Sequence, residues 1–129
     1  MKNEGDSLKT PSLTSPKLQV LISLADRERH GYAIIKEVER RSGGKVRLSP
    51  GTLYPIIRRL LEAGLIEESN QRPDPDLDDE RRRYYRLGER GREAAIAETE
   101  RMEEVVAQAR AKKLFRAIED DELQEAESF

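Results

Sequence analysis

The chain has 129 residues, of which 39 % are charged and only 5 % are aromatic, and its formal net charge is −2. This length predicts one small domain with tails, and the composition is typical of a helical, heavily solvated protein. The sequence has no cysteine and a single histidine, His30, which excludes disulfides, zinc–thiolate sites and a histidine cluster. We therefore predict no metal and no cofactor. The lack of a Gly-rich phosphate loop and of a nucleophile–base pair argues against an enzyme.

The N-terminal part is predicted to be a flexible arm, residues 1–13, followed by a helix over about 16–27. Ser15 and Pro16 look like a helix N-cap followed by proline at the first helical position. The arm lacks the apolar stretch of a signal peptide, and no run in the chain approaches 18 apolar residues. We therefore expect a cytoplasmic protein with no membrane partner. The helix is apolar on more than one side, so a second subunit is expected to supply part of its cover.

A turn over "DRERHGY" leads to a second predicted helix, about 31–42, which Gly43 and Gly44 end. Its predicted apolar face consists of Tyr32, Ile35 and Val38, with Ile34 beside them. Gly31 is expected to let the chain turn. We interpret His30 as a residue whose imidazole satisfies a nearby backbone group, in preference to a pH or ligand sensor. The following "KVRLS" is a candidate short strand.

The stretch "LSPGTLYPIIRRLLEAGLI" (48–66) predicts a third helix over about 50–63. Its apolar residues recur with helical spacing at Leu53, Ile56, Ile57, Leu60 and Leu61. Gly64 is suited to the C′ position that ends it. Two N-caps are open. With Ser49 as the cap, Pro55 means that the first turn is either kinked or a separate short turn, whereas with Thr52 as the cap Pro55 lies in the first turn at no cost.

Two strand-like runs come next, "LIEESNQ" (65–71) and "RRRYYRL" (81–87), separated by the polar loop "RPDPDLDDE". They predict a hairpin in which one of Tyr84 and Tyr85 is a core residue, because neighbours on a strand face opposite sides. A fourth helix, about 89–116, carries a loose heptad seam through Ala95, Met102 and Ala109. An acidic tail, 117–129, completes the chain.

Three short helices closed by a hairpin predict a mainly α fold with a small β hairpin, a winged helix-turn-helix. In this fold the helix before the hairpin enters the DNA major groove. We expect the winged-helix domain to span 14–87 and a long C-terminal dimerisation helix to span 88–116. The charge is segregated in a way that supports this. Residues 17–65 carry a net +5 and residues 87–129 a net −5, which suggests an anion-binding face in the first half.

The segments "LISLADRERHGYAIIKEVE", "LSPGTLYPIIRRLLEAGLIEE" and "RRRYYRLGERGREAA" resemble the PadR family of transcriptional regulators. The resemblance covers about residues 17–115, with the pieces in the family's order and at its spacings. It implies a homodimer that binds double-stranded DNA, mostly as a repressor and often relieved by a small-molecule effector. The short C-terminal part looks like the subfamily with a single long terminal helix. The alternative is a winged-helix protein–protein interaction module without DNA binding.

Two positions depart from the family pattern. Gly88 stands where the family usually has threonine, so the cap of the last helix lacks a side-chain oxygen at a cost of a few tenths of a kcal/mol. The acidic loop "PDPDLDDE" argues against a close contact between the wing tip and phosphate.

The predicted DNA contacts fall on the third helix and on the second hairpin strand. We assign groove or base-edge proximity to Thr52, Pro55 and Arg59, with Gly51 on the same face. Phosphate or sugar contacts are assigned to Ser49, Tyr54 and Arg58, because most such contacts are to the backbone. At least one of Arg81, Arg82 and Arg83 is expected to bind the backbone, the alternative being that they pair with Asp78, Asp79 and Glu80. Further positive charge comes from Lys17, Lys36, Arg40, Arg41, Lys45 and Arg47, among which Lys36 and Arg40 are the main candidates at the edge.

The predicted dimer interface joins the first and last helices. A helix of 28 residues is about 42 Å long, which overshoots a core of this size. Part of it must therefore find another partner. The expected interface residues are Leu18, Leu21, Ile22 and Leu24 of the first helix and Met102, Val105, Val106 and Ala109 of the last, from the partner or from the same chain.

Overall fold

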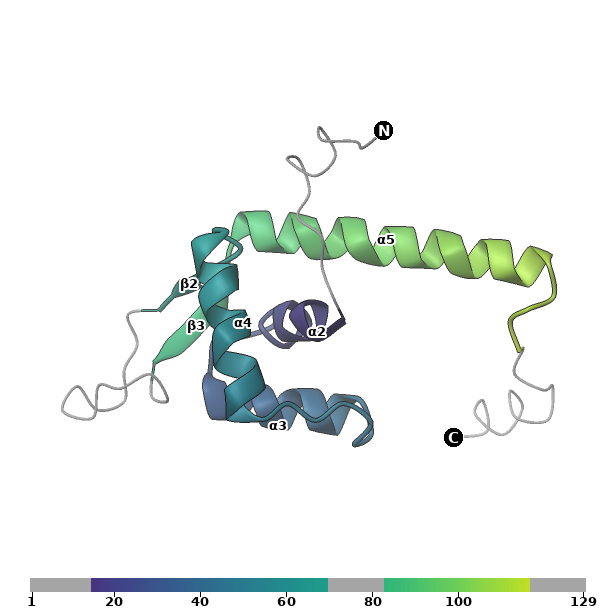
Figure 1. Cartoon of the computed structure of the whole chain (residues 1–129). Helices are drawn as coiled ribbons and strands as arrows, with labels where there is room; N and C mark the ends of the chain where they lie inside the picture. The colour runs from purple at the N-terminus through teal and green to yellow at the C-terminus, as the bar shows by residue number, and fades with distance from the viewer. Residues whose placement is uncertain (1–14, 70–82, 117–129) are drawn as a thin grey trace. The chain divides into compact units, whose positions relative to one another are not determined.

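The computed structural model describes residues 15–69 and 83–116. Its elements are α2 (Ser15–Ser23), β1 (Arg29–His30), α3 (Gly31–Arg41), α4 (Pro50–Glu62), β2 (Ile66–Glu68), β3 (Tyr84–Leu87) and α5 (Glu89–Ala111) (Figure 1). The chain divides into two compact units, 1–98 and 99–129, whose boundary falls within α5. The predicted fold class is confirmed, since α2, α3 and α4 with a small antiparallel sheet form a winged helix in the first unit.

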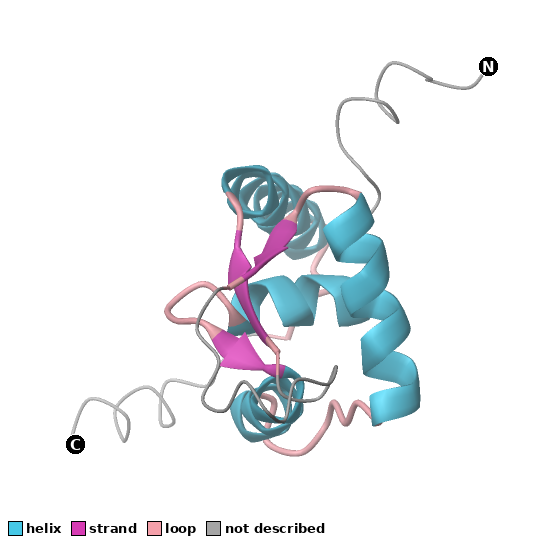
Figure 2. Cartoon of the chain, turned by 90° about the vertical axis from the view of Figure 1, so that its left-hand side faces the viewer, coloured by secondary structure: helices cyan, strands magenta, loops and turns pink. Residues whose placement is uncertain are grey.

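The sheet has three strands in the order β1-β3-β2, all antiparallel, and Figure 2 shows them in magenta. Strand β2 pairs with β3 in the register Ile66↔Leu87 and Glu68↔Tyr85, which is the predicted hairpin. The third strand was not predicted. Arg29 and His30 lie in the expected turn "DRERHGY", but they pair with Tyr85 and Tyr84 across β3. Two residues are too few to show an alternating pattern in the sequence. The segment is a strand only because it pairs with β3 in the folded chain.

The ends of two helices differ from the sequence expectation. Helix α2 ends at Ser23, not near 27, because Leu24 and Ala25 donate to Leu21 and Ile22 in tight i→i−3 bonds. The Ser23 hydroxyl also donates to the Val20 carbonyl at 2.7 Å, an alternative to continued helix.

Helix α5 ends at Ala111, not at 116. Lys113 adopts a positive φ of 62°, and the N–H of Leu114 bonds the Ala109 carbonyl at 2.8 Å. These features form a Schellman-type C-terminus without the usual glycine. Because the glycine is missing, the sequence did not predict that the helix ends here. The candidate strand "KVRLS" is not a strand either. Its Val46 N–H donates to the Ser42 hydroxyl at 2.9 Å, a side-chain bond that ties the loop to the end of α3.

The C-terminal end of α4 confirms the role predicted for Gly64. This glycine has φ 75°, its N–H bonds the Leu61 carbonyl at 3.0 Å, and the Leu65 N–H bonds the Leu60 carbonyl at 2.9 Å. The pair of bonds is the Schellman motif that a glycine at C′ permits. It turns the chain directly from the end of α4 into the hairpin.

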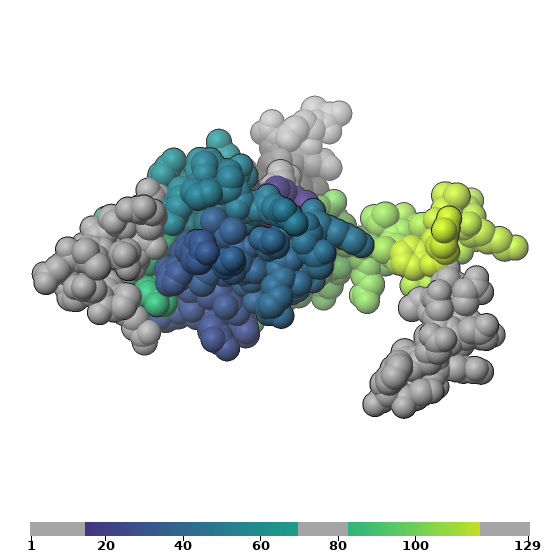
Figure 3. Space-filling model, turned by 90° about the horizontal axis from the view of Figure 1, so that it is seen from below, coloured from purple at the N-terminus to yellow at the C-terminus, as the bar shows by residue number. Residues whose placement is uncertain are grey.

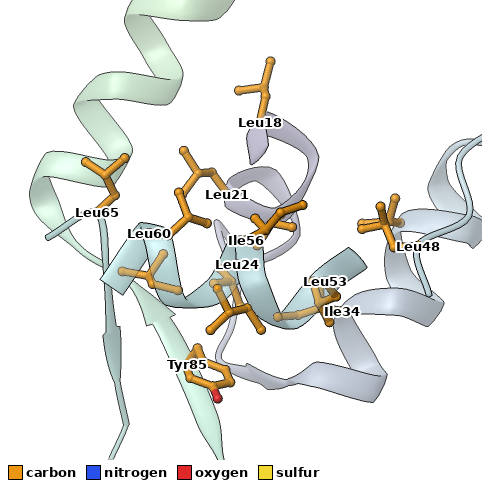
Figure 4. Close-up of a cluster of buried hydrophobic side chains, with 14 of the residues drawn as sticks. Leu18, Leu21, Leu24, Ile34, Leu48, Leu53, Ile56, Leu60, Leu65 and Tyr85 are labelled. Carbon is orange, nitrogen blue, oxygen red and sulfur yellow. The ribbon is translucent and has the colours of Figure 1, made fainter. Parts of the chain in front are cut away.

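The core lies between α2, α3, α4 and the sheet (Figure 4). Its buried apolar side chains include Leu21, Ile34, Leu53, Leu60 and Tyr85. The prediction that one of the two tyrosines is a core residue is confirmed, because Tyr85 is 2 % exposed while Tyr84 is half-buried. The buried face of α3 differs from the predicted one. Its buried residues are Gly31, Ile34 and Val38, whereas Tyr32 is 59 % exposed.

Candidate nucleic-acid interface

The start of α4 resolves the choice between the two N-caps. Ser49 has extended backbone (φ −85°, ψ 161°), and its hydroxyl oxygen accepts from the Thr52 N–H at 3.2 Å. Pro50 therefore takes the first helical position, where its missing N–H is not needed. The Ser49 and Thr52 hydroxyls are themselves 3.2 Å apart. Both residues are exposed, so the first turn presents two hydroxyl groups on one surface.

Pro55 lies inside α4, one and a half turns after the cap. Because proline has no N–H, the Gly51 carbonyl loses the donor that a regular helix would supply. Gly51 is exposed and has no side chain, and Pro55 is half-buried. The N-terminal half of α4 is therefore stiff and low in profile, so that a large surface can approach its backbone closely.

The two faces of α4 are chemically distinct. Leu53, Ile56, Ile57 and Leu60 are buried, while Arg58 and Arg59 are exposed one turn below the small residues. Figure 3 shows α4 and α3 forming adjoining parts of one surface of the molecule. Helix α4, which carries the predicted residues, therefore adjoins α3, and Lys36 of α3 is exposed.

The cations on this surface are not equally available. Glu37 of α3 gathers three arginines, with Arg40 at 2.5 Å, Arg41 at 3.3 Å and Arg29 at 3.7 Å. By contrast, neither Lys36 nor Arg59 has a carboxylate within ion-pair distance among residues 15–69 and 83–116. The Lys36 ammonium lies 5.4 Å from the centre of the Tyr32 ring, a cation–π distance that leaves its charge accessible. A charge held by a carboxylate must be released before it can bind phosphate, so Lys36 and Arg59 are the available ones.

Glu37 is expected to give this region a pH-dependent stability. The hydrogen bond from Arg40 holds the pKa of the Glu37 carboxyl below its usual 4.5, and Arg41 and Arg29 act in the same direction. A lowered folded-state pKa stabilises the fold above pH 4.5, and this contribution is lost as the pH falls through the folded pKa. The difference in unfolding free energy between wild type and Glu37→Gln should therefore be constant near neutral pH and shrink in acid. Urea unfolding at a series of pH values measures it, and a difference that does not change between neutral and acidic pH would contradict the assignment.

The wing is the hairpin formed by β2, β3 and their connecting loop. Arg83 forms an ion pair with Glu68 on the neighbouring strand at 3.4 Å, and Arg86 forms one with Glu67 at 2.9 Å. Ser69 is buried, and its hydroxyl donates to the Glu28 carboxylate at 2.6 Å, which fixes the base of the wing. Arg81, Arg82 and the acidic loop lie outside the described residues, so the predictions about them stay predictions.

His30 has the local role that the sequence suggested. Its Nδ1 accepts from the Ala33 N–H at 3.2 Å, which makes the imidazole the N-cap of α3. Gly31, however, is not there for a turn. It has no positive φ and begins α3, and a Cβ built on it would lie 2.3 Å from the Tyr54 hydroxyl oxygen. Its role is to leave room for that tyrosine, a requirement that depends on the folded contact.

Comparison with known proteins shows which family the chain belongs to. Residues 20–97 match the model of the transcriptional regulator PadR-like family. The chain belongs to the PadR-like family. It is 38 % identical over 89 residues to the transcriptional regulator Rv3488 of Mycobacterium tuberculosis, over 69 % of this chain and 77 % of that protein.

Solved structures agree at the level of the fold. A transcriptional regulator from Clostridium thermocellum matches with a TM-score of 0.61 at 22 % identity, over 78 % of this chain and 92 % of its own. A PadR family transcription regulator from Clostridium difficile R20291 matches with a TM-score of 0.56 at 23 % identity, over 74 % and 97 %. The family is one of transcriptional regulators, not a class of enzymes.

The residues predicted for a subunit interface separate into two groups in this PadR-like chain. Leu18, Leu21 and Leu24 are buried in the core of their own chain, so they have almost no surface left for a partner. Ile22 is only partly buried beside them. On α5, Met102 is 50 % and Val105 55 % exposed, and Val106 and Ala109 are half-buried. Apolar surface that could meet a partner is thus concentrated on α5, the helix that the heptad seam singled out.

The described residues contain neither a membrane-spanning helix nor a metal-binding cluster. None of the helices within 15–69 and 83–116 combines the length and apolar character that crossing a bilayer requires. Over the same ranges, no three His, Cys, Asp or Glu side chains are grouped so that they could hold a metal ion.

Proposed function

We propose that the chain is a homodimeric, sequence-specific regulator that binds double-stranded DNA in the cytoplasm and represses transcription. The observation that carries the proposal is the outer face of α4. It combines a stiff, low-profile first half with an available Arg59, and α4 packs against α3, which carries the available Lys36. A helix of this kind, placed before a wing, is the element that enters the major groove in helix-turn-helix proteins.

The residues divide naturally between reading and positioning. Gly51, Thr52 and Pro55 let the backbone of α4 approach base edges, and Arg59 has the forked donors that suit guanine. We assign Ser49 and Lys36 to phosphate contacts, which orient a protein on DNA without reading its sequence. Arg58 flanks this face. Arg83 contributes at the wing once its ion pair with Glu68 opens.

Dimerisation is assigned to α5. In this proposal the DNA-binding domain spans 14–87, the dimerisation helix spans 88–116, and the acidic tail follows at 117–129. The exposed Met102 and Val105, with Val106 and Ala109 beside them, would meet the same surface of a second copy. Burying such side chains is favourable by about 25 cal/mol per Å² of apolar area. A small-molecule effector that releases the DNA completes the proposal, as the family resemblance implies.

Selection from a random library tests the proposal. The purified chain is incubated with random 30-bp duplexes, and bound DNA is amplified and sequenced over several rounds. A symmetric dimer should enrich a pseudo-palindrome whose half-sites lie about one helical turn, ~10 bp, apart. Light scattering on the same sample should give the mass of a dimer. A chain that enriches no motif would favour the protein–protein interaction module instead.

A further inference from the structure

The phenol ring of Tyr54 occupies a notch at the start of α3. The nearest atoms to a Cβ built on Gly31 are the Tyr54 hydroxyl oxygen at 2.3 Å and two ring carbons at 2.7 and 3.0 Å. Real Cβ atoms essentially never approach other atoms that closely, so an alanine at position 31 would require the end of the Tyr54 side chain to shift. Gly31 has an ordinary helical backbone, and the constraint is therefore space alone.

The start of α3 is also joined to the wing. His30, next to Gly31, pairs with Tyr84 across β1 and β3, and the two rings meet edge to face with their centroids 5.2 Å apart. The other residue of β1, Arg29, donates to the Ser23 carbonyl at 2.7 Å, which fixes this strand to the end of α2. The junction formed by His30 and Gly31 therefore contacts α4 through Tyr54 and contacts strand β3 of the wing through Tyr84.

We propose that Tyr54 acts in DNA binding as a positioning residue, whose ring sets the spacing between α4 and the junction that carries the wing. This inference rests on the proposed function and refines it, because the sequence had assigned Tyr54 to a phosphate or sugar contact. The half-buried ring of Tyr54 is packed, and packed rings transmit displacement because protein interiors are close-packed. A displaced α4 loses the geometry in which it and the wing bind one duplex together.

Three variants separate the positioning role from a direct contact. Gly31→Ala adds the methyl group that meets the ring. Gly31→Ala/Tyr54→Leu adds the same methyl group but removes the ring that it meets. Tyr54→Phe keeps the ring and removes only the hydroxyl group. The probe is the 30-bp duplex that the wild-type chain selects, with a random-sequence duplex as the non-specific reference. Binding is followed by fluorescence anisotropy, and circular dichroism at the same temperature checks that each variant is folded.

The readout is the ratio of affinities for the selected and the random duplex, which general loss of folded protein would not change. Gly31→Ala should lower this ratio about tenfold or more, equivalent to about 1.4 kcal/mol. The double variant should recover only part of the loss, because the steric conflict is gone but the ring that sets the spacing is gone as well. Tyr54→Phe keeps the ring and should stay within about threefold of wild type. If Gly31→Ala does not fold, the double variant and Tyr54→Phe still decide the matter.

Three results would overturn the positioning role while leaving the proposed function intact. The first is wild-type discrimination by Gly31→Ala. The second is a loss of about tenfold in Tyr54→Phe, which would show that the hydroxyl group itself contacts DNA. A double variant no better than Gly31→Ala would equally reject the steric coupling. By contrast, a wild-type chain that selects no duplex would remove the proposed function itself.

Discussion

Gly91→Ala is expected to lower the free energy of unfolding by about 2–3 kcal/mol, the usual cost of overpacking a tight contact. A Cβ built on Gly91 would lie 2.0 Å from the Leu65 carbonyl oxygen and 2.9 Å from the Leu87 Cδ1. The backbone around that carbonyl cannot move aside easily. The carbonyl accepts from the Gly88 N–H at 3.0 Å, and Leu65 forms part of the turn that ends α4. The first turn of α5 therefore packs against the start of the hairpin with no room for a methyl group.

Gly51→Ala is the matched control. The nearest atom to a Cβ built there is the Ser49 hydroxyl oxygen at 3.9 Å, which is ordinary contact distance. Gly51 lies in α4 with no positive φ, so alanine should be neutral or stabilise the helix by up to about 1 kcal/mol. Urea unfolding followed by circular dichroism gives both values. Equal stability of the two variants would show that α5 does not dock on the hairpin as described.

Lys36→Glu/Arg59→Glu is expected to weaken binding of the selected duplex by about 100-fold or more, since each lost contact is worth about 1–3 kcal/mol. Both side chains are exposed, and neither has a carboxylate partner among the described residues. Each reversal therefore removes an available charge and places a carboxylate next to phosphate, while the core residues of α3 and α4 stay unchanged. Anisotropy titrations at one fixed salt concentration measure the effect.

Arg27→Glu/Arg90→Glu makes the same change in net charge outside α3 and α4. Both arginines are exposed, Arg27 in the loop after α2 and Arg90 in the first turn of α5. This control should lose only the long-range electrostatic attraction, which salt screens beyond about 10 Å at 0.1 M. If the control loses as much affinity as the α3–α4 variant, the charge of the chain matters for binding but the position of the two cations does not.

The sequence predicted best what depends on neighbours along the chain. The bounds of α3 and α4 were correct to within one residue, because glycine or proline signals and an apolar stripe at helical spacing lie within each segment. Strand β1 was missed because the strand it pairs with, β3, is far away in the sequence. The end of α5 was missed because Lys113 adopts the left-handed conformation without the glycine that normally signals it.

The candidate site shows the same division. Ser49 was identified as one of two possible caps from its place before proline, and the outer face of α4 followed from its inner stripe. The pairing of Glu37 with Arg40 and Arg41 has the spacing of neighbours on one helix face. Its pairing with Arg29 could not be foreseen, since Glu37 reaches Arg29 only once β1 lies beside α3. The need for glycine at position 31 could not be predicted from the sequence either. It is set by a side chain from another helix, and that side chain, Tyr54, had been assigned to DNA from its sequence position alone.

The salt dependence of binding to the selected duplex shows whether the α3–α4 surface binds DNA through its available cations. If each subunit of a dimer contributes at least Lys36 and Arg59, about four phosphate charges are neutralised, and the slope of log K against log salt should be about −3.5 or steeper. The Lys36→Glu/Arg59→Glu variant should give a much shallower slope than wild type. A wild-type affinity that does not change with salt, or one whose slope survives that double substitution, would contradict the account.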